Sequence, residues 1–443
     1  MSPSARLWSR LDNHGSKKAL WAKGVSASYG ELIAWAVRAG EDLARSGVRE
    51  GDVVALGVEF GVESAARWLA LLRARAVAAL VPCLCPADDP RVTDACAIWH
   101  WGAGADLRRL DAPRDHALLS ELRQAGKPGL VLFTGGTTAR PRAVLHDADE
   151  FLAARESSIT RDYRLLSIMP MQHVGGLDTL VRLWWSGATL VVPQARGPLA
   201  VAEAIVGGGV EVLVTPPSFL NLFCLAGPIC IEAGAILRVV AFGAEPMPPS
   251  LLTRMNARWP RTQFRQRFGA TEVGPISVGG GDGTDFAIDP AQAEHRIVDG
   301  ELWVRARGQM LGYLNAPESG LTPDGWFATG DQVVQLPGGF LRVRGRCNTV
   351  VNVGGVKVLP EEIERALTGV QGVAAIRAYG QSHAIMGQTM TIEVVAVPGV
   401  DRAELRIRLR VEAARTLESH QRPVAIRFVE SLNLTESGKI ARE

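Results

Sequence analysis

Short apolar runs alternate along this chain with longer amphipathic segments, and this alternation restricts the possible folds most. Residues 52–58 form an apolar run after a Gly-Asp turn, residues 63–76 have apolar positions at helical spacing, and residues 77–81 are apolar again. A strand, a helix and a strand in this order favour a parallel sheet that is buried on both faces. The same kind of apolar run recurs at residues 130–133, 189–192, 211–214 and 237–242. We therefore expect an α/β fold with a large N-terminal domain of parallel-rich sheets layered with helices.

The pattern changes after Arg346. Pro360 and the acids that follow it are typical of a helix start. The pattern then predicts strands at residues 371–379 and 389–397, a helix near 401–417 and a strand at 424–429. This αββαβ order describes a small α+β domain, which we expect to be mobile. The predicted domains are residues 1–346 and 347–443, with the boundary within Gly345–Asn348.

Composition excludes several classes of function. The chain has 443 residues and a formal net charge of +2, so no strong field attracts it to nucleic acid or to an anionic membrane. No stretch approaches the roughly 18 apolar residues of a membrane helix, and residues 1–20 lack the apolar core of a signal peptide. We therefore expect a cytoplasmic protein. Cys83 and Cys85 form a CxC without a second pair, so we interpret them as strand-end packing rather than as metal ligands.

Four turns at expected strand ends carry chemically active residues: FTGGTTARPR (133–142), TPPSF (215–219), FGAEP (242–246) and FGATE (268–272). Ligands of parallel sheets bind at the carboxyl ends of the strands. The first turn offers free backbone N–H groups, the hydroxyls of Thr134, Thr137 and Thr138, and two guanidinium groups. These donors suit the phosphates of a nucleotide, although the Gly-Lys-Ser/Thr ending of a Walker loop is absent.

Seven segments together resemble the adenylate-forming superfamily of acyl- and aryl-CoA synthetases, peptide-synthetase adenylation domains and luciferases. In chain order they are FTGGTTARPRAVLH (133–146), MPMQHVGGL (169–177), FGAEP (242–246), FGATE (268–272), GWFATGD (325–331), GRCNTVVNVGGVKVLPEEIE (345–364) and LTESGKIAR (434–442). The resemblance extends from about residue 20 to the C-terminus. It implies attack of a carboxylate on the α-phosphorus of ATP, which forms acyl-AMP and releases pyrophosphate. A second nucleophile, often the thiol of coenzyme A, then displaces AMP.

The resemblance also implies residue roles. Lys439 would bridge the carboxylate and the α-phosphate, Glu272 would hold Mg²⁺, and Thr271 would bind phosphate oxygens. Phe268 would stack on adenine, Asp331 would accept both ribose hydroxyls, and Arg346 would add a contact. The remaining cofactor-binding residues it implies are Thr134, Gly135, Gly136, Thr137, Thr138, Arg142, Gly243, Ala244, Glu245, Gly269 and Ala270.

For the acid, the resemblance implies a pocket behind His173, which would line it and change rotamer between the two half-reactions. The candidate substrate-binding residues are His173, Val174, Thr215, Pro216, Ser218 and Phe242, with Gly243 beside them. They include no cation for a second carboxylate, a role that Arg182 or Arg238 could fill. The compact length and the PMQHVGG segment are similar to those of o-succinylbenzoate and aryl-acid CoA ligases, so we expect an aromatic or small acyl acid.

The sequence departs from the family pattern at several positions. Gly135 replaces a usual Ser and so removes one phosphate donor, whereas Arg142 replaces a usual Lys and keeps the charge. Asn348 stands where the family usually has the hinge Asp, and Asn352 replaces a Lys. The last two changes lie in the segment that reorients for the second half-reaction. They leave adenylation better supported than transfer to coenzyme A.

Three functions remain open at this point. The leading hypothesis is an ATP- and Mg²⁺-dependent carboxylate–CoA ligase. The acceptor could instead be a carrier-protein thiol supplied in trans, an amine or another small nucleophile. A third class is a non-catalytic relative that binds nucleotide, which the presence of Lys439 and Glu272 disfavours. We expect a monomer or a homodimer.

Overall fold

The computed structural model describes residues 1–104, 106–110, 115–134, 140–276, 278–279, 284–316, 320–383, 386–433, 435 and 440. Within them, one sheet of seven strands has the order β13-β12-β11-β9-β10-β1-β2. Its neighbours are parallel except for the β1/β2 hairpin. The strands are β1 (Lys18–Ala22), β2 (Val25–Ser28), β9 (Arg164–Ser167), β10 (Thr189–Val192), β11 (Val212–Thr215), β12 (Val239–Phe242) and β13 (Gln263–Gln266). The carboxyl ends of β9, β11, β12 and β13 therefore meet at one edge.

The second large sheet of the described residues has the order β20-β8-β7-β4-β3-β5-β6. Its centre is parallel, whereas β6, β8 and β20 pair antiparallel at its two sides. The strands are β3 (Val53–Val58), β4 (Val77–Pro82), β5 (Trp99–Trp101), β6 (Arg108–Arg109), β7 (Gly129–Thr134), β8 (Arg142–Asp147) and β20 (Gly312–Tyr313). The predicted α/β class with parallel-rich sheets is confirmed.

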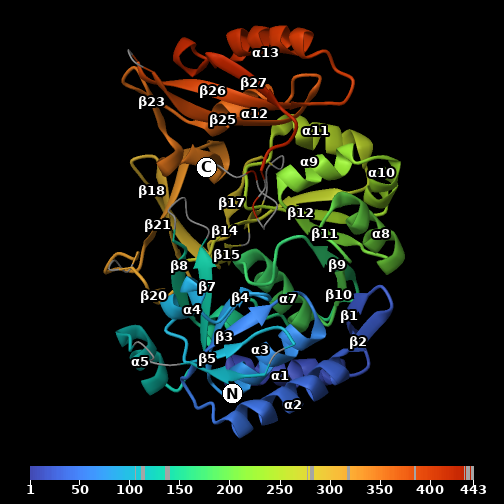
Figure 1. The fold of residues 1–443 in the computed structure, drawn as a ribbon, viewed down its shortest axis with the longest axis vertical. Coiled ribbons are helices and arrows are strands. Elements are labelled where there is room, and N and C mark those ends of the chain that lie inside the picture. Colours follow the sequence, from blue (N-terminus) through green and yellow to red (C-terminus); the bar gives the residue numbers. More distant parts are fainter. Residues whose placement is uncertain are drawn as a thin grey trace.

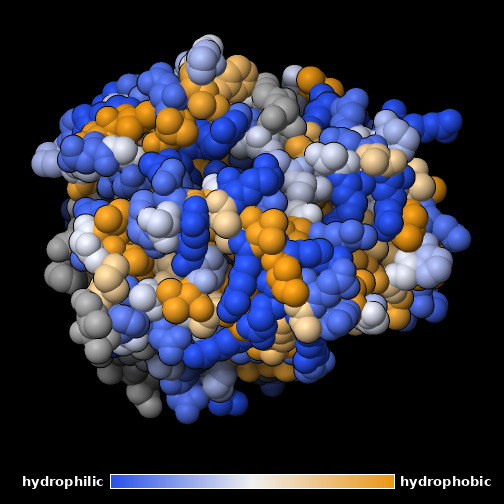
Figure 2. Space-filling view, turned by 90° about the horizontal axis from the view of Figure 1, so that it is seen from above, coloured by the Kyte–Doolittle hydropathy of each residue, from blue (hydrophilic) through white to orange (hydrophobic). Residues whose placement is uncertain are grey.

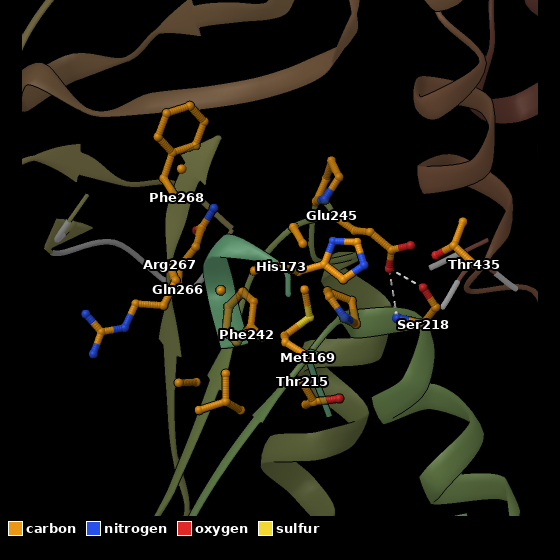
Figure 3. Close-up of a pocket in the computed structure, with 18 of the residues that line it drawn as sticks. Met169, His173, Thr215, Ser218, Phe242, Glu245, Gln266, Arg267, Phe268 and Thr435 are labelled. Atoms are coloured by element: carbon orange, nitrogen blue, oxygen red, sulfur yellow. Dashed lines mark hydrogen bonds between the residues drawn. The ribbon is translucent and has the colours of Figure 1, made fainter. Parts of the chain in front are cut away.

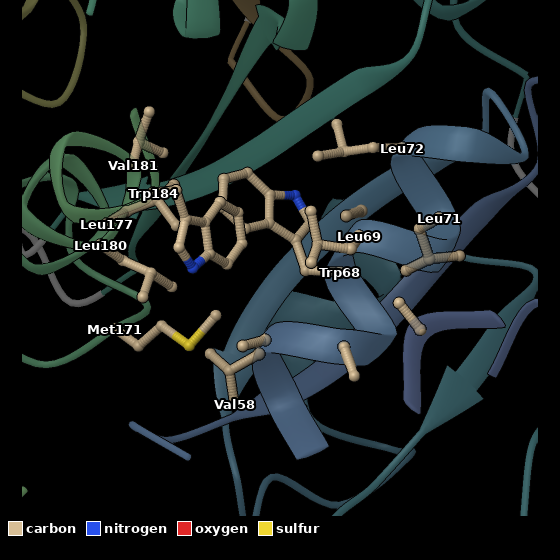
Figure 4. Packing of buried hydrophobic residues seen from close by; sticks show 14 of the residues in the cluster. Val58, Trp68, Leu69, Leu71, Leu72, Met171, Leu177, Leu180, Val181 and Trp184 are labelled. Atoms are coloured by element: carbon tan, nitrogen blue, oxygen red, sulfur yellow. The ribbon is translucent and has the colours of Figure 1, made fainter. Parts of the chain in front are cut away.

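Helices between and around these sheets bury two hydrophobic cores with them, and the larger core joins residues of both sheets (Figure 1). The helices of this part are α1 (Pro3–His14), α2 (Tyr29–Ser46), α3 (Val62–Arg73), α4 (Pro90–Asp94), α5 (Ala117–Gln124), α6 (Ala148–Ala153) and α7 (Val174–Ser186). Figure 4 shows α3 packed against α7, where Trp68 stacks on Trp184 with ring centroids 5.1 Å apart. Because both indoles are buried, this contact fixes the position of α7.

Four further helices cover the outer face of the first sheet and bury another core with it. They are α8 (Pro198–Gly208), α9 (Pro217–Leu225), α10 (Pro228–Ala235) and α11 (Pro249–Arg258). Two short antiparallel strand pairs and a four-stranded antiparallel sheet follow, which the sequence pattern did not predict. Their strands are β14 (Phe268–Ala270), β15 (Gly274–Ile276), β16 (Val278–Gly279), β17 (Ala287–Ile288), β18 (Ala293–Val298), β19 (Glu301–Ala306), β21 (Phe327–Gln335) and β22 (Leu341–Arg346).

The C-terminal part lies at the top of Figure 1 and has a core cluster of its own, drawn from residues 351–428. Its elements are β23 (Val351–Val353), β24 (Val356–Val358), α12 (Pro360–Leu367), β25 (Val373–His383), β26 (Gly387–Ala396), α13 (Arg402–Thr416) and β27 (Ala425–Val429). These match the predicted αββαβ order, with a β23/β24 hairpin added before it. The domain boundary at residues 346/347 stays a prediction.

The surface of the C-terminal part is mixed in character. Figure 2 looks down on this end of the molecule and shows hydrophilic and hydrophobic side chains interleaved. On α13, Leu405 and Leu409 are buried, whereas Ile407 and Val411 are exposed. Among the helices of the described residues, none is long and apolar enough to cross a membrane.

Candidate functional site

A cavity of about 1880 Å³ opens at the carboxyl ends of the first sheet and continues to the C-terminal part. It gathers residues that are far apart in the chain. The predicted residues that line it are Thr134, Arg142, His173, Val174, Thr215, Ser218, Phe242, Gly243, Ala244, Glu245, Phe268, Gly269, Ala270, Thr271, Glu272, Asp331, Arg346 and Asn348. Most of the residues predicted from the seven segments therefore face one space.

Some predictions do not fall on this lining. Gly135, Gly136, Thr137, Thr138 and Lys439 lie outside the described residues. Pro216 does not line the cavity, and its neighbour Pro217 does so instead. The reason is local: α9 begins at Pro217, so the chain turns there toward the cavity.

His173 stands at the entrance to α7, directly before the first helical residue. The turn before it is tight, since a Cβ on Gly176 would lie 2.0 Å from the Pro170 carbonyl oxygen. Only glycine permits this approach. Figure 3 shows the His173 ring among Met169, Phe242 and Glu245, directed into the pocket. The close contact at Gly176 thus sets where the imidazole lies.

Glu272 lines the cavity and is held in place by Tyr313. The Tyr313 hydroxyl donates to Glu272 Oε1 at 2.9 Å, and the Arg142 guanidinium lies 5.1 Å from the centre of the Tyr313 ring. Burial, followed by the charge of Glu272, raises the pKa of Tyr313 above its ordinary value. Tyr313 therefore remains a hydrogen-bond donor and orients a carboxylate that faces the cavity.

The two turns predicted to bind adenine lie beside each other. Phe268 stacks on Phe286 with centroids 5.0 Å apart, so one face of its ring is covered by protein. Ala244 has a φ of 69°, in the left-handed region that non-glycine residues rarely adopt. Backbone strain of this kind is concentrated at functional sites, where the surrounding structure maintains it.

Asp331 and Arg346 face each other across the pair β21 and β22. Arg346 Nη1 donates to Asp331 Oδ1 at 2.9 Å. The ion pair places a carboxylate and a guanidinium together at the cavity wall. Asn348, the predicted hinge residue, lies in the short 3₁₀ turn Cys347–Thr349 that connects β22 to β23.

Glu245 makes contacts that the sequence analysis did not predict. Its Oε2 accepts hydrogen bonds from the backbone N–H of Ser218, at 3.1 Å, and from the Ser218 hydroxyl (Figure 3). Its Oε1 accepts from the backbone N–H of Ile440 at 3.2 Å. One carboxylate thus connects the start of α9, the FGAEP turn and the C-terminal segment. Ile440 is the neighbour of Lys439 in the chain.

A charged cluster is centred on Asp178 of α7, the helix that begins directly after His173. Asp178 accepts from Arg155 Nε at 2.8 Å and from Arg182 Nε at 2.9 Å. Burial alone would raise the pKa of Asp178, but Arg182 and Arg155 hold it below its ordinary value. Burial lowers the pKa of Arg155 to about 10. Arg267 lies near this cluster and was also missed, although its position directly before FGATE in an Arg-Gln-Arg strand end offered a signal.

Comparison with known proteins agrees with this geometry. The AMP-binding enzyme family matches residues 105–314, and the AMP-binding enzyme C-terminal domain matches residues 362–439. A 3-[(3aS,4S,7aS)-7a-methyl-1,5-dioxo-octahydro-1H-inden-4-yl]propanoyl:CoA ligase of Mycobacterium tuberculosis is 30% identical over 334 residues, 70% of this chain and 64% of that protein. An indoleacetate–CoA ligase of Aromatoleum aromaticum is 27% identical over 71% of this chain and 66% of its own length. These alignments thus span somewhat less than two thirds of either relative.

Solved structures match over nearly the whole chain. An anthranilate CoA ligase in complex with anthranoyl-AMP has a TM-score of 0.85 at 18% identity, and the match covers 99% of this chain and 95% of that one. A benzoate CoA ligase from Burkholderia xenovorans has a TM-score of 0.83 at 20% identity, with 99% and 98% covered. At these identities the likeness concerns the fold. Together with the two family matches, it shows that this chain belongs to the adenylate-forming superfamily of AMP-binding enzymes.

Proposed function

We propose that this protein activates a carboxylic acid with ATP as acyl-AMP, releases pyrophosphate and transfers the acyl group to the thiol of coenzyme A. The main support is the single cavity that joins the predicted nucleotide residues, the pocket of His173 and the segment next to Lys439. A reaction between two anions needs positive charge and fixed donors where they meet. Such groups converge here from both parts of the chain.

In this proposal the nucleotide lies between Phe268 and the Asp331–Arg346 pair. Phe268 lines the cavity, is held by its stack on Phe286, and would offer an aromatic surface to the flat adenine ring. Asp331 accepts the ribose hydroxyls, since a carboxylate has only acceptors. Arg142 faces the phosphates together with the hydroxyl of Thr134.

The part of the cavity formed by Glu272 and Thr271 suits Mg²⁺. Glu272 presents a carboxylate whose Oε1 is oriented by Tyr313, and Thr271 adds an oxygen beside it. Oxygen donors of this kind fit a hard cation. Bound Mg²⁺ would offset the negative charge of the phosphates. The protein's own part is to hold Glu272 in place and to keep Arg142 near the same phosphates.

Lys439 is proposed to donate to both the carboxylate and the α-phosphate. Support comes from its chain neighbour Ile440, whose N–H binds Glu245 within the cavity. The contact corresponds to the first half-reaction, because the lysine is needed there.

The acceptor has one alternative that a specific observation favours. Matched relatives include fatty acid–acyl-carrier-protein ligases of Mycobacterium tuberculosis and Streptomyces coeruleorubidus, 26% identical over 71% of this chain. A carrier-protein thiol supplied in trans is therefore the second candidate. Both thiols end in the same pantetheine arm. A cytoplasmic location and a monomeric or homodimeric state remain predictions.

ATP–pyrophosphate exchange with Mg²⁺ across benzoates, cinnamates and short fatty acids tests the proposal. Exchange with one class of acid is the expected result. Coenzyme A is then added and the products are weighed: a thioester mass supports the CoA acceptor, whereas acyl-AMP that persists beside coenzyme A contradicts it. No exchange with any carboxylic acid would contradict the proposed adenylation.

A further inference from the structure

The cavity continues past His173 as a channel between α7 and the inner face of the first sheet. Val212 and Val214 on β11, and Val239 and Ala241 on β12, line it. Successive side chains of a strand alternate between faces, so these four share one face. The strand pairing aligns Val212 with Val239 and Val214 with Ala241. The channel therefore has an apolar floor that extends three residues, roughly 10 Å, from the end of β11.

The opposite wall is charged. Asp178 and Arg182 lie four residues apart on α7 and both line the channel. This spacing places them on one face of the helix. The other side of α7 is occupied by the Trp184 contact with Trp68, so the helix cannot turn these charges away without breaking its packing. The polar wall is therefore built into the fold.

Charge is unbalanced in this wall. Asp178 accepts from both Arg155 and Arg182, so one carboxylate already serves two guanidinium groups. Arg155 is 4% exposed and lies behind the wall, where its Nη1 also donates to the Phe151 carbonyl at 2.5 Å. Arg182 retains donors that face the channel, since only its Nε is used by Asp178.

Arg267 adds a third guanidinium from the other side. It lines the channel at the end of β13, and it has no carboxylate partner among the described residues. Its side chain is exposed to the cavity, so its guanidinium is accessible to a ligand. A carboxylate of a bound acid would pair with it there.

We propose that the acid carries a second acidic group, with its apolar middle on Val214 and Ala241 and its distal carboxylate bound by Arg267 and Arg182. This inference rests on the proposed adenylation and specifies its substrate class. Arginine suits the role, because its planar fork binds a carboxylate through two parallel hydrogen bonds. A monoacid with an apolar far end would leave Arg267 without a carboxylate partner and the remaining donors of Arg182 unused.

Matched pairs of acids test this without altering the protein. Pyrophosphate exchange is measured with benzoate against terephthalate, cinnamate against carboxycinnamate, and octanoate against suberate. We expect the diacid of at least one pair to have a kcat/KM roughly 10- to 100-fold higher, as charge-assisted hydrogen bonds predict. A sulfonated analogue in place of the distal carboxylate distinguishes carboxylate recognition from general anion binding. Exchange that favours the monoacid in every pair would overturn the inference and leave adenylation intact.

The variant Arg267→Gln tests whether Arg267 binds the distal carboxylate. The variant should lose most of the preference for the diacid, chiefly through KM, and should change exchange with the matched monoacid by less than about threefold. Arg267→Lys should restore only part of the preference, because lysine lacks the bidentate fork. Arg261→Gln is the matched control, since Arg261 is exposed in the turn before β13 and does not line the cavity.

The outcomes separate the two proposals. Equal losses for the diacid and the monoacid in Arg267→Gln, or no loss for either, would contradict the assigned role. If no acid of any kind supports exchange in the wild-type protein, the proposed function fails and not only its substrate class.

Discussion

At the scale of single residues, the proposed chemistry depends on side chains that orient others. Tyr313 is the clearest example, because its hydroxyl donates to Glu272 Oε1 at 2.9 Å and its ring lies beside Arg142. Tyr313→Phe keeps the ring and removes the hydroxyl, which interacts with the Arg142 guanidinium as well as with Glu272. We expect adenylation to fall about 3- to 10-fold, as the loss of one hydrogen bond to a charged group predicts. The Mg²⁺ concentration for half-maximal rate should rise.

Exchange rates across a Mg²⁺ titration measure this effect. Tyr379→Phe is the control, since that hydroxyl accepts from Arg427 in the C-terminal part. An unchanged Mg²⁺ dependence in Tyr313→Phe would show that the tyrosine does not position Glu272.

A second residue-scale prediction concerns acid sensitivity. His146 is fully buried, and burial, followed by the charge of Arg155, lowers its pKa to about 4. A histidine with a depressed folded pKa stabilises the protein above its unfolded value near 6.5, and this stability is lost as pH falls toward 4. The contribution is on the order of 3 kcal/mol.

Urea unfolding between pH 7 and pH 4 measures it. His146→Gln should flatten the decline of the unfolding free energy over this window, even if the variant is less stable throughout. The exposed His295 offers a control in His295→Gln. An equally steep decline in His146→Gln would assign the acid sensitivity to other groups.

At the scale of elements, the link between the C-terminal segment and the first sheet is one carboxylate. Glu245 accepts from Ser218 at the start of α9 and from the N–H of Ile440. Glu245→Gln keeps the shape but weakens these bonds, because a neutral acceptor binds N–H groups less strongly. We expect adenylation to fall roughly 10-fold, whereas transfer from preformed acyl-AMP should change by less than about threefold.

Single-turnover assays of each half-reaction test this split. Glu232→Gln, at an exposed position of α10, provides the control. An equal effect of Glu245→Gln on both half-reactions would mean that the contact does not belong to the first step.

Elements also show what sequence could predict. The periodic runs located β3, α3, β4, β10 and the C-terminal elements within a few residues, because their apolar spacing reflects local burial. The sheet of β18, β19, β21 and β22 was missed, since its strands are half-exposed and carry a weaker alternation. Strand order also escaped prediction, because it depends on contacts between distant segments.

The residues of the candidate site also divide into those that the sequence could predict and those that it could not. Motif residues such as Phe268, Glu272 and Asp331 could be predicted because each lies in a recognisable turn, and all three line the cavity. Asp178 and Arg267 were missed, since their role arises only when the fold brings α7 and the end of β13 to one cavity. Tyr313 was missed for the same reason, because 41 residues separate it from Glu272.

At the scale of the whole molecule, one cavity connects the first sheet, the β21/β22 pair and the C-terminal part. A reaction with two half-reactions needs such a junction, because the groups for each step come from different parts of the chain. Lys439 lies in the C-terminal part of the sequence and is proposed to act only in the first half-reaction. Its removal should therefore affect that step alone. This separation is the central claim.

The decisive measurement compares both half-reactions in the wild-type protein and in Lys439→Ala. We expect acid-dependent pyrophosphate exchange in the wild type and a loss of at least about 100-fold in the variant, as for other transition-state electrostatic groups. Transfer from preformed acyl-AMP should remain within about threefold. Exchange that survives in Lys439→Ala, or an equal loss of both half-reactions, would contradict the account.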